Sequence, residues 1–255
     1  MLKRPVFPGL AAILVAMSVL IPRHQEPASL PHPTAGLRQS QELPHTRLVS
    51  NIGQILLADG FSGLPLGMNW IDGSHHGNWL DRYGGYGQVG VALLGSNAQS
   101  SAPKASSRPS ETHAALVNSL RTFGDVDITL SMKTIKQLRT PRPNPWEMAW
   151  VLWHYTDDVH FYYVVLKTNG WELGKEDPAY PGAQRFLITR SSPRFKPGVW
   201  YSVHIRQVGR VITVWVGRTK LGAYWDRQRA YTSGSLGLYC EDSRVAFDNV
   251  RVVQA

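Results

Sequence analysis

Apolar side chains are most concentrated in residues 146–175, where two apolar runs are separated by the polar residues 156–159. A short polar segment between two such runs is typical of a hairpin turn, so this stretch predicts two long antiparallel strands. Successive side chains of a strand point to opposite faces, which places Trp150 and Trp153 on different faces. Only one of these rings can therefore join the core. We expect Trp153 to face outward, because it shares its face with Glu147.

Shorter alternating runs extend this pattern on both sides of the hairpin. Residues 113–120 and 123–138 predict a strand pair, and residues 201–217 predict a second hairpin. Residues 233–255 predict two further strands, whereas the Ser- and Pro-rich residues 96–112 predict a surface loop. About ten to twelve strands at regular spacing, with no sustained helical repeat after residue 60, predict an all-β antiparallel two-sheet jelly-roll sandwich.

The N-terminal part of the chain differs in composition from the rest. Lys3 and Arg4 precede an uncharged apolar run, which is typical of an export signal. No Ala-x-Ala cleavage pattern follows, so residues 1–28 are interpreted either as a signal peptide or as an N-terminal membrane anchor. Residues 29–50, rich in proline and without periodicity, predict a disordered linker. Residues 51–255 then form one domain, and we expect the protein to be secreted or held in the cell envelope.

Charge and cysteine content narrow the classes of partner. The formal net charge is +9, but no block of Lys or Arg stands out after residue 50, so we expect no nucleic-acid binding. Contact with a membrane is expected only through the possible N-terminal anchor. The single cysteine, Cys240, cannot form an internal disulfide, and its apolar neighbours predict a buried position. The oligomeric state is left open.

Several segments, taken in order, carry a family resemblance. They are DGFSG at the start of the domain, WEMAWVLW and YYVVLKTNGWELGK in the hairpin, GVWYSVHIRQVGRVITVWVG, and the closing GLYCEDSRVAFDNVRV. This order resembles the concanavalin A-like lectin/glucanase superfamily, and within it the laminin-G-like domains and the 3-keto-disaccharide hydrolases. The resemblance spans residues 51–255 and implies a jelly-roll fold. Because this superfamily holds lectins, glycosidases and polysaccharide lyases, the resemblance leaves the activity open.

Aromatic rings beside charged groups are what a polar, ring-shaped ligand such as a sugar requires. We therefore interpret the chain as an exported carbohydrate-binding domain that engages a polysaccharide or glycan on its concave sheet. Binding of this kind needs no tuned pKa. The expected ligand-binding residues are Arg139, Trp153, Tyr155, Tyr163, Lys167, Trp171, Lys175, Gln184 and Arg185.

Two enzyme functions remain as alternatives. A glycoside hydrolase would pair Glu147 with Glu172 across neighbouring strands, with carboxyl groups about 5–5.5 Å apart for retention or about 6.5–9.5 Å for inversion. The Glu-x-Asp-x-Glu signature of laminarinase-type relatives does not occur in the sequence. A polysaccharide lyase of this superfamily would instead use a Tyr/His pair, with Arg and Gln neutralising a uronate. The residues that the sequence offers for these roles are Tyr162, Tyr163, His154, Lys167, Gln184, Arg139 and Arg185.

The laminin-G-like resemblance also implies a structural calcium ion at the rim of the sandwich. In such relatives the oxygen ligands come from the first and last strands. Asp59 and Asp248 lie in the corresponding parts of this sequence, and carboxylate oxygens are ligands that calcium prefers. We therefore expect a structural Ca²⁺ at these two residues and no organic cofactor.

Overall fold

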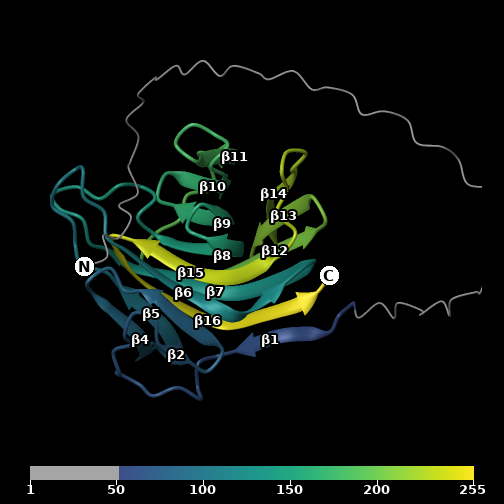
Figure 1. Ribbon diagram of the computed structural model, residues 1–255. Coiled ribbons are helices and arrows are strands. Elements are labelled where there is room, and N and C mark those ends of the chain that lie inside the picture. The colour runs from purple at the N-terminus through teal and green to yellow at the C-terminus, as the bar shows by residue number, and fades with distance from the viewer. Residues whose placement is uncertain (1–51) are drawn as a thin grey trace, which may run out of the picture. The chain divides into compact units, whose positions relative to one another are not determined.

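Residues 52–255, which the computed structural model describes, fold into two eight-stranded antiparallel sheets (Figure 1). No residue in this part of the chain is helical. Sheet A consists, in spatial order, of β14 (Thr219–Trp225), β13 (Val211–Val216), β12 (Tyr201–Val208), β7 (Val126–Gln137), β16 (Ser243–Gln254), β5 (Asn97–Ala102) and β4 (Gln88–Leu93), with β1 (Ile55–Asp59) paired to β16. Sheet B consists of β11 (Gln184–Arg190), β10 (Gly170–Glu176), β9 (His160–Lys167), β8 (Ala149–Asp157), β15 (Gly234–Glu241), β6 (Ala114–Phe123), β3 (Trp79–Tyr83) and β2 (His75–His76).

The main hydrophobic core is shared by the two sheets. On β7 every second side chain from Val126 through Ile128 and Leu130 is buried, which is the alternation of a strand with one face in the core. Val151 of β8 and Leu238 of β15 join the same cluster from sheet B. The predicted all-β, antiparallel two-sheet jelly-roll sandwich is confirmed.

Two details of the strand order differ from the sequence-based expectation. The strands β6 and β7 do not pair with each other, because β6 lies between β15 and β3 in sheet B, whereas β7 lies between β12 and β16 in sheet A. The chain changes sheets between them, and both strands still turn apolar side chains to the shared core. Residues 97–102, expected in a surface loop, form β5 between β16 and β4. Small buried side chains such as Ala98 and Ser101 are sufficient there, because the backbone pairing holds the strand.

The β8–β9 hairpin closes at the expected turn, but its two tryptophans face the opposite way. Trp153 is 1% exposed and belongs to the core, whereas Trp150 lies on the other face. The expectation that Trp153 faces outward is therefore wrong. His154 has a φ of 49°, and the register with β9 shifts after Trp153. This irregularity places Tyr155 on the same face as Trp150, so simple alternation along the strand fails.

Two predictions about the N-terminal part of the chain lie outside the described residues. They are the signal peptide or anchor over residues 1–28 and the disordered linker over residues 29–50, and both stay predictions. From residue 52 onward, the structure contains no helix long and apolar enough to cross a membrane. Cys240 is buried, as its apolar neighbours predict.

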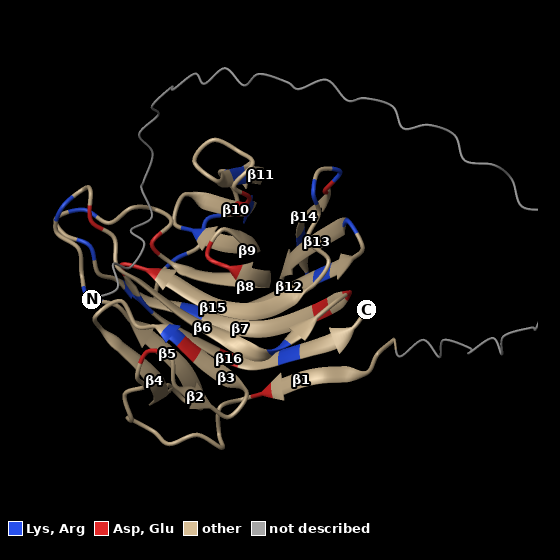
Figure 2. Ribbon diagram, viewed as in Figure 1, with Lys and Arg blue, Asp and Glu red and all other residues tan. Residues whose placement is uncertain are grey.

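Charged residues are spread over both sheets. Figure 2 shows Lys and Arg interspersed with Asp and Glu along strands and loops, without one continuous basic stripe in this view. A protein that tracks a nucleic-acid backbone usually gathers its basic side chains on one face. The distribution agrees with the expectation that nucleic acid is not a partner, which stays a prediction.

Candidate functional site

A second cluster of aromatic and apolar side chains lies on the outer face of sheet B, the face turned away from sheet A. Its residues alternate with those of the core along the strands, as Trp150 does with Val151 and Tyr163 with Val164. Sheet B is thus apolar on both faces, although an antiparallel sheet needs only one such face to fold. The members of this outer-face cluster are Leu116, Met148, Trp150, Leu152, Tyr155, Phe161, Tyr163, Val165 and Tyr239.

One cross-strand row of this outer face brings a carboxylate next to packed rings. Glu172 on β10 pairs with Val165, and Val165 pairs in turn with Trp150 on β8. Trp150 is also paired with Tyr239 on β15. Directly paired side chains of neighbouring strands lie on the same face. The Trp150 ring is 4.8 Å from the Tyr163 ring and 5.7 Å from the Tyr239 ring, so the acid borders a continuous aromatic group.

Glu172 is the centre of a hydrogen-bond network on this face. The Tyr163 hydroxyl donates to Glu172 Oε1 at 2.8 Å, and Lys167 Nζ donates to Glu172 Oε2 at 2.7 Å. Gln184 Nε2 donates to the Tyr163 hydroxyl oxygen at 3.0 Å. Burial, followed by the nearby Glu172 charge, raises the pKa of Tyr163 well above its ordinary value, so this phenol stays a hydrogen-bond donor. Four of the residues expected in the site therefore lie together.

Gly174 makes room for the ring of Tyr163, its partner across β9 and β10. A Cβ atom on Gly174 would lie 2.3 Å from both Cζ and the hydroxyl oxygen of Tyr163. Glycine inside a strand often marks such a close approach. The glycine in WELGKE is thus a sequence signal for the position of this phenol.

We expect Gly174→Ala to displace Tyr163 from Glu172 and to lower the free energy of unfolding by about 1–3 kcal/mol, the usual cost of overpacking. Urea unfolding measures this as a lower midpoint at unchanged slope. Gly63→Ala is the matched control, since nothing lies within 4 Å of a Cβ atom there. Equal midpoints for the two variants would contradict the contact.

Two further carboxyl groups, those of Glu176 on β10 and Glu241 on β15, also lie on the outer face of sheet B. Glu176 lies four residues after Glu172 on β10, so the two side chains point to the same face. Glu241 accepts a hydrogen bond from the Tyr239 hydroxyl at 2.8 Å. Burial, followed by the charge of Glu241, raises the pKa of Glu176 to about 8. Burial likewise raises the pKa of Glu241 to about 7. Carboxyl groups that hold protons near neutral pH are functional-site candidates.

The raised pKa of Glu176 predicts a pH-dependent stability. Between its ordinary pKa near 4.5 and its folded pKa of about 8, the folded protein holds a proton that the unfolded chain releases. Stability is therefore lost as the pH rises through this window. We expect Glu176→Gln to reduce the fall in melting temperature between pH 5 and pH 8. Asp72→Asn, at an exposed position, is the control. A Glu176→Gln protein whose melting temperature depends on pH as before would contradict the raised pKa of Glu176.

Phe186 is an exposed ring beside the recessed network, and Trp146 is a second exposed ring, just before β8. Phe186 on β11 is 51% exposed and pairs with Gly174, which places it on the outer face. Trp146 precedes β8, is 43% exposed, and accepts a hydrogen bond on its carbonyl oxygen from Trp150 Nε1 at 2.8 Å. Exposed rings beside buried polar groups suit a ligand with one apolar and one polar side.

Glu147 and Arg139 belong to a different group of hydrogen bonds and ion pairs. Glu147 precedes β8 and is fully buried, where it accepts hydrogen bonds from Arg139 Nε and from Asn144 Nδ2. Arg139 also donates to Asp242 Oδ2 at 2.7 Å. The expected catalytic pairing of Glu147 with Glu172, and ligand binding by Arg139, are therefore not supported by this geometry. The alternation was extended to residue 147, whereas the strand begins only at residue 149.

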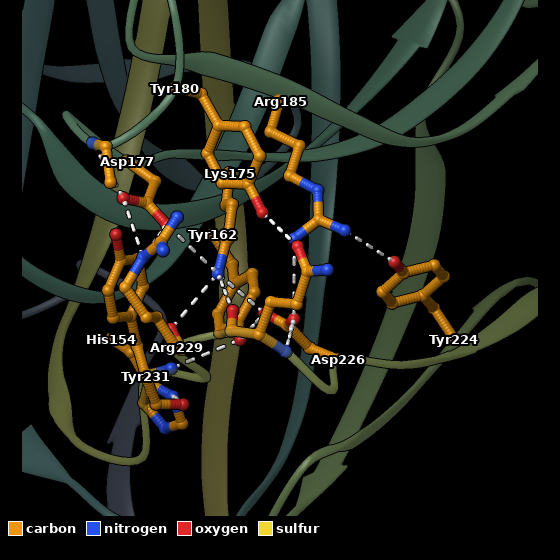
Figure 3. Close-up of polar contacts among 12 residues, drawn as sticks. His154, Tyr162, Lys175, Asp177, Tyr180, Arg185, Tyr224, Asp226, Arg229 and Tyr231 are labelled. Carbon is orange, nitrogen blue, oxygen red and sulfur yellow. Dashed lines mark hydrogen bonds and ion pairs between the residues drawn. The ribbon is translucent and has the colours of Figure 1, made fainter.

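Lys175 and Arg185 belong to a polar cluster on the core side of β10 and β11 (Figure 3). Lys175 is fully buried, and its Nζ donates to Asp226 Oδ2 at 2.8 Å and to the Gln228 carbonyl at 2.7 Å. Arg185 donates to the hydroxyl of Tyr224 at 3.3 Å. Lys175 is thus a structural residue, and its expected role in ligand binding is not supported. It alternates with Glu172 rather than sharing its face.

The remaining expected residues are divided between the core and the outer face. Trp171 is buried in the core, and Trp153 donates from Nε1 to Gln207 there. Tyr155 lies on the outer face and donates to Asp158 at 2.8 Å. The His154 ring nitrogens contact the backbone carbonyl oxygens of Tyr231 and Gly124, at 2.9 Å each. Of the residues expected of a polysaccharide lyase, Tyr163, Lys167 and Gln184 lie together on the outer face, whereas His154, Arg139 and Arg185 are engaged elsewhere.

The expected calcium ligands are already engaged by protein donors. Asp59 accepts hydrogen bonds from the backbone N–H of Phe61 and from Trp79 Nε1, and Asp248 accepts one from the Ser96 hydroxyl at 2.6 Å. Calcium takes about 6–8 oxygen ligands, and N–H groups directed at the same carboxylate do not fit that set. Within residues 52–255 no group of three or more His, Cys, Asp and Glu side chains could hold a metal ion. Calcium stays a prediction, which melting with and without a chelator tests, since a bound ion raises the midpoint.

Comparison with known protein families gives one match over most of the described domain. The family model is described as a 3-keto-alpha-glucoside-1,2-lyase-like domain, and it matches residues 69–253. The resemblance to 3-keto-disaccharide hydrolases, inferred from the sequence segments, is thereby confirmed. A sequence comparison with curated proteins gives no match.

Solved structures share the fold at low sequence identity. The carbohydrate-binding module CBM66 from Bacillus subtilis aligns with a TM-score of 0.52 and 12% identity, over 74% of this chain and 99% of that one. A Bacillus subtilis protein of unknown function with a galectin-like fold aligns with a TM-score of 0.53 and 10% identity, over 80% and 97% of the two chains. At these identities the likeness shows the fold alone, which is that of the concanavalin A-like sandwiches.

Proposed function

Because the chain belongs to the 3-keto-alpha-glucoside-1,2-lyase-like domain family, we propose that it binds carbohydrate on the outer face of sheet B. The ligand would be a glucoside or a longer glycan. The fold supports this proposal, since a carbohydrate-binding module shares it over nearly its whole length. The supporting residues come from β8, β9, β10, β11 and β15 of one sheet.

The observation that carries the proposal is the network of Glu172, Lys167, Tyr163 and Gln184 beside exposed Phe186. A pyranose has hydroxyl groups around its edge and C–H groups on its faces. The carboxylate and the ammonium can accept from and donate to neighbouring hydroxyls, while a ring covers an apolar face of the sugar. A sheet does not need a carboxylate, an ammonium group and an exposed ring side by side on its outer face in order to fold.

The test is retention of the purified protein on a panel of immobilised polysaccharides and oligosaccharides. We expect retention by at least one glucose-containing member, and weaker retention of Phe186→Ala and Glu172→Gln. Trp225→Ala is the matched control, because Trp225 is an equally exposed ring on β14 of sheet A. Equal loss in the control, or no retention by any member, would contradict the proposal.

Elimination on a 3-keto-glucoside is a second candidate function, and the raised pKa values of Glu176 and Glu241 favour it. In such a reaction a base removes the C2 hydrogen, which the C3 ketone acidifies. A C1–C2 double bond then forms, the C1–O bond breaks, and the leaving oxygen takes up a proton. Glu176 fits the proton donor and Glu241, with the lower pKa, fits the base. Acid–base catalysis of this kind contributes about 10²–10⁴-fold to a rate.

The same panel, extended by a 3-keto-glucoside, separates binding from catalysis. Elimination releases an unsaturated product that absorbs in the ultraviolet, whereas hydrolysis releases only reducing ends. We expect Glu176→Gln and Glu241→Gln each to lower the elimination rate by about 100-fold or more while retention is kept. Retention without any release would leave a binding domain.

Export to the cell envelope or the medium is also proposed, from the basic residues and the apolar run in residues 1–28. Immunodetection of the full chain in fractionated cells tests it. Recovery in the cytoplasmic fraction alone would contradict export. The size of the recovered protein separates a cleaved signal from a retained anchor.

A further inference from the structure

A cleft of about 330 Å³ lies on the outer face of sheet B, lined by residues of β3, β6, β8 and β15. This volume is at the lower end of the range of about 300–1,000 Å³ that small-molecule sites occupy. The cleft shares Tyr155 with the outer-face cluster, but its other lining residues are distinct from the Glu172 network. It is therefore a second place on the face where a ligand can be held.

Asn118 gives this cleft a buried hydrogen-bond acceptor without a partner. Its side chain is 1% exposed, and Nδ2 donates to Ser235 Oγ at 3.1 Å. Ser235 Oγ in turn donates its proton to the Tyr155 carbonyl at 3.2 Å, so it has none left for the amide oxygen. Asn118 Oδ1 has no hydrogen-bond partner. An unsatisfied buried acceptor costs about 1–3 kcal/mol, and a donor entering the cleft would remove this cost.

Arg82 gives the same cleft a positive charge. It is exposed, and its guanidinium lies 5.6 Å from the centroid of the Tyr155 ring. No acidic side chain lines the cleft. The nearby Asp158 accepts hydrogen bonds from the hydroxyls of Tyr155 and Tyr83, at 2.8 and 3.4 Å, and is thereby engaged. Leu120, 46% exposed, adds an apolar surface.

We infer that this cleft binds a hexuronate unit, with its carboxylate on Arg82 and a hydroxyl donating to Asn118 Oδ1. The sugar ring then lies against Leu120 and Tyr155. This inference rests on the proposed carbohydrate function and deepens it, because it names an acidic sugar for one end of the outer face. Guanidinium groups pair well with carboxylates, and a charged hydrogen bond is stronger than a neutral one.

Titration of the purified protein with methyl glucuronide and with methyl glucoside tests the inference. We expect the glucuronide to bind at least about tenfold more tightly, and more weakly as salt is added. Arg82→Gln should remove this tenfold advantage and leave the glucoside affinity unchanged, and Arg82→Lys should restore part of it. Arg251→Gln, an exposed arginine on β16 of sheet A, is the control.

Equal affinity for the two sugars, or an Arg82→Gln protein that keeps the preference, would overturn the inference. The proposed function fails differently, since it requires that Phe186→Ala and Glu172→Gln weaken retention on neutral glycans. If Glu172→Gln lost glucuronide binding and Arg82→Gln kept it, the glucuronide would bind at the Glu172 network. That result would also overturn the assignment to this cleft.

Discussion

Replacing Lys175 with methionine is expected to lower the free energy of unfolding by about 3–5 kcal/mol, the usual cost of leaving one partner of a buried ion pair alone. The nearest acidic partner of Lys175 is Asp226, which is fully buried and 2.8 Å from Lys175 Nζ, and Asp177 Oδ2 lies 3.4 Å from the same ammonium. Burial alone would raise the pKa of Asp226, but hydrogen bonds from Lys175 and Tyr162 hold it below its ordinary value. Without the ammonium, the carboxylate keeps hydrogen bonds from the Tyr162 hydroxyl and the Gln228 N–H, and its nearest remaining cation is Arg185, 3.8 Å away.

Chemical denaturation of three variants measures this effect. Lys136→Met removes an exposed lysine of β7 and should change the stability by less than about 0.5 kcal/mol. Adding Asp226→Asn to Lys175→Met should recover part of the loss, because it removes the stranded charge. A Lys175→Met protein as stable as the Lys136→Met control would contradict the structural assignment of Lys175.

Replacing Arg139 with methionine is expected to cost a similar amount, about 3–5 kcal/mol. This guanidinium donates to two buried carboxylates, those of Glu147 and Asp242. It also donates to the carbonyl oxygens of Arg108 and Glu111, each at 2.8 Å. The substitution leaves both carboxylates without their counter-charge and frees the loop that holds these two carbonyls.

Arg142→Met is the matched control, since this arginine lies in the same connection and is exposed. Thermal or urea unfolding should show a large loss for Arg139→Met and almost none for Arg142→Met. Retention on a glycan matrix should survive the substitution in any fraction that remains folded, because Arg139 is not assigned to the binding face. Loss of retention by folded, stable protein would contradict that assignment.

The fold could be predicted because most strands bury one face only. On β7 the sequence alternates between buried Val126, Ile128 and Leu130 and partly exposed neighbours, so the pattern reports the strand directly. The partner of each strand was harder to infer. Two amphipathic strands in succession, such as β6 and β7, give the same pattern whether they pair or cross to opposite sheets.

The binding face could be predicted only in part, because sheet B is apolar on both sides. Along β8 every residue from 149 to 155 is buried, so nothing in the sequence says which of Trp150 and Trp153 faces the core. The backbone irregularity at His154 also shifts Tyr155 relative to the alternation. Tyr163 and Lys167 of β9, both expected in the site, do meet at Glu172 on the outer face.

Glu176 and Glu241 were missed for a different reason. A search for a known catalytic triplet looks along one strand, whereas these two carboxyl groups come from β10 and β15. Their pKa values are raised mainly by burial, which depends on the assembled sheet and not on neighbouring residues in the sequence. The spacing of Glu172 and Glu176, four positions apart on one strand, was the available signal, because it places both on one face.

The most direct measurement of where the ligand binds is amide NMR of labelled protein titrated with the glycan that the panel retains best. If carbohydrate lies on the outer face of sheet B, the largest shifts will come from β8, β9 and β10, around Trp150, Tyr163 and Glu172. The strands β13 and β14, at one end of sheet A, will then change little. Shifts centred on sheet A, with these three residues unmoved, would contradict the account.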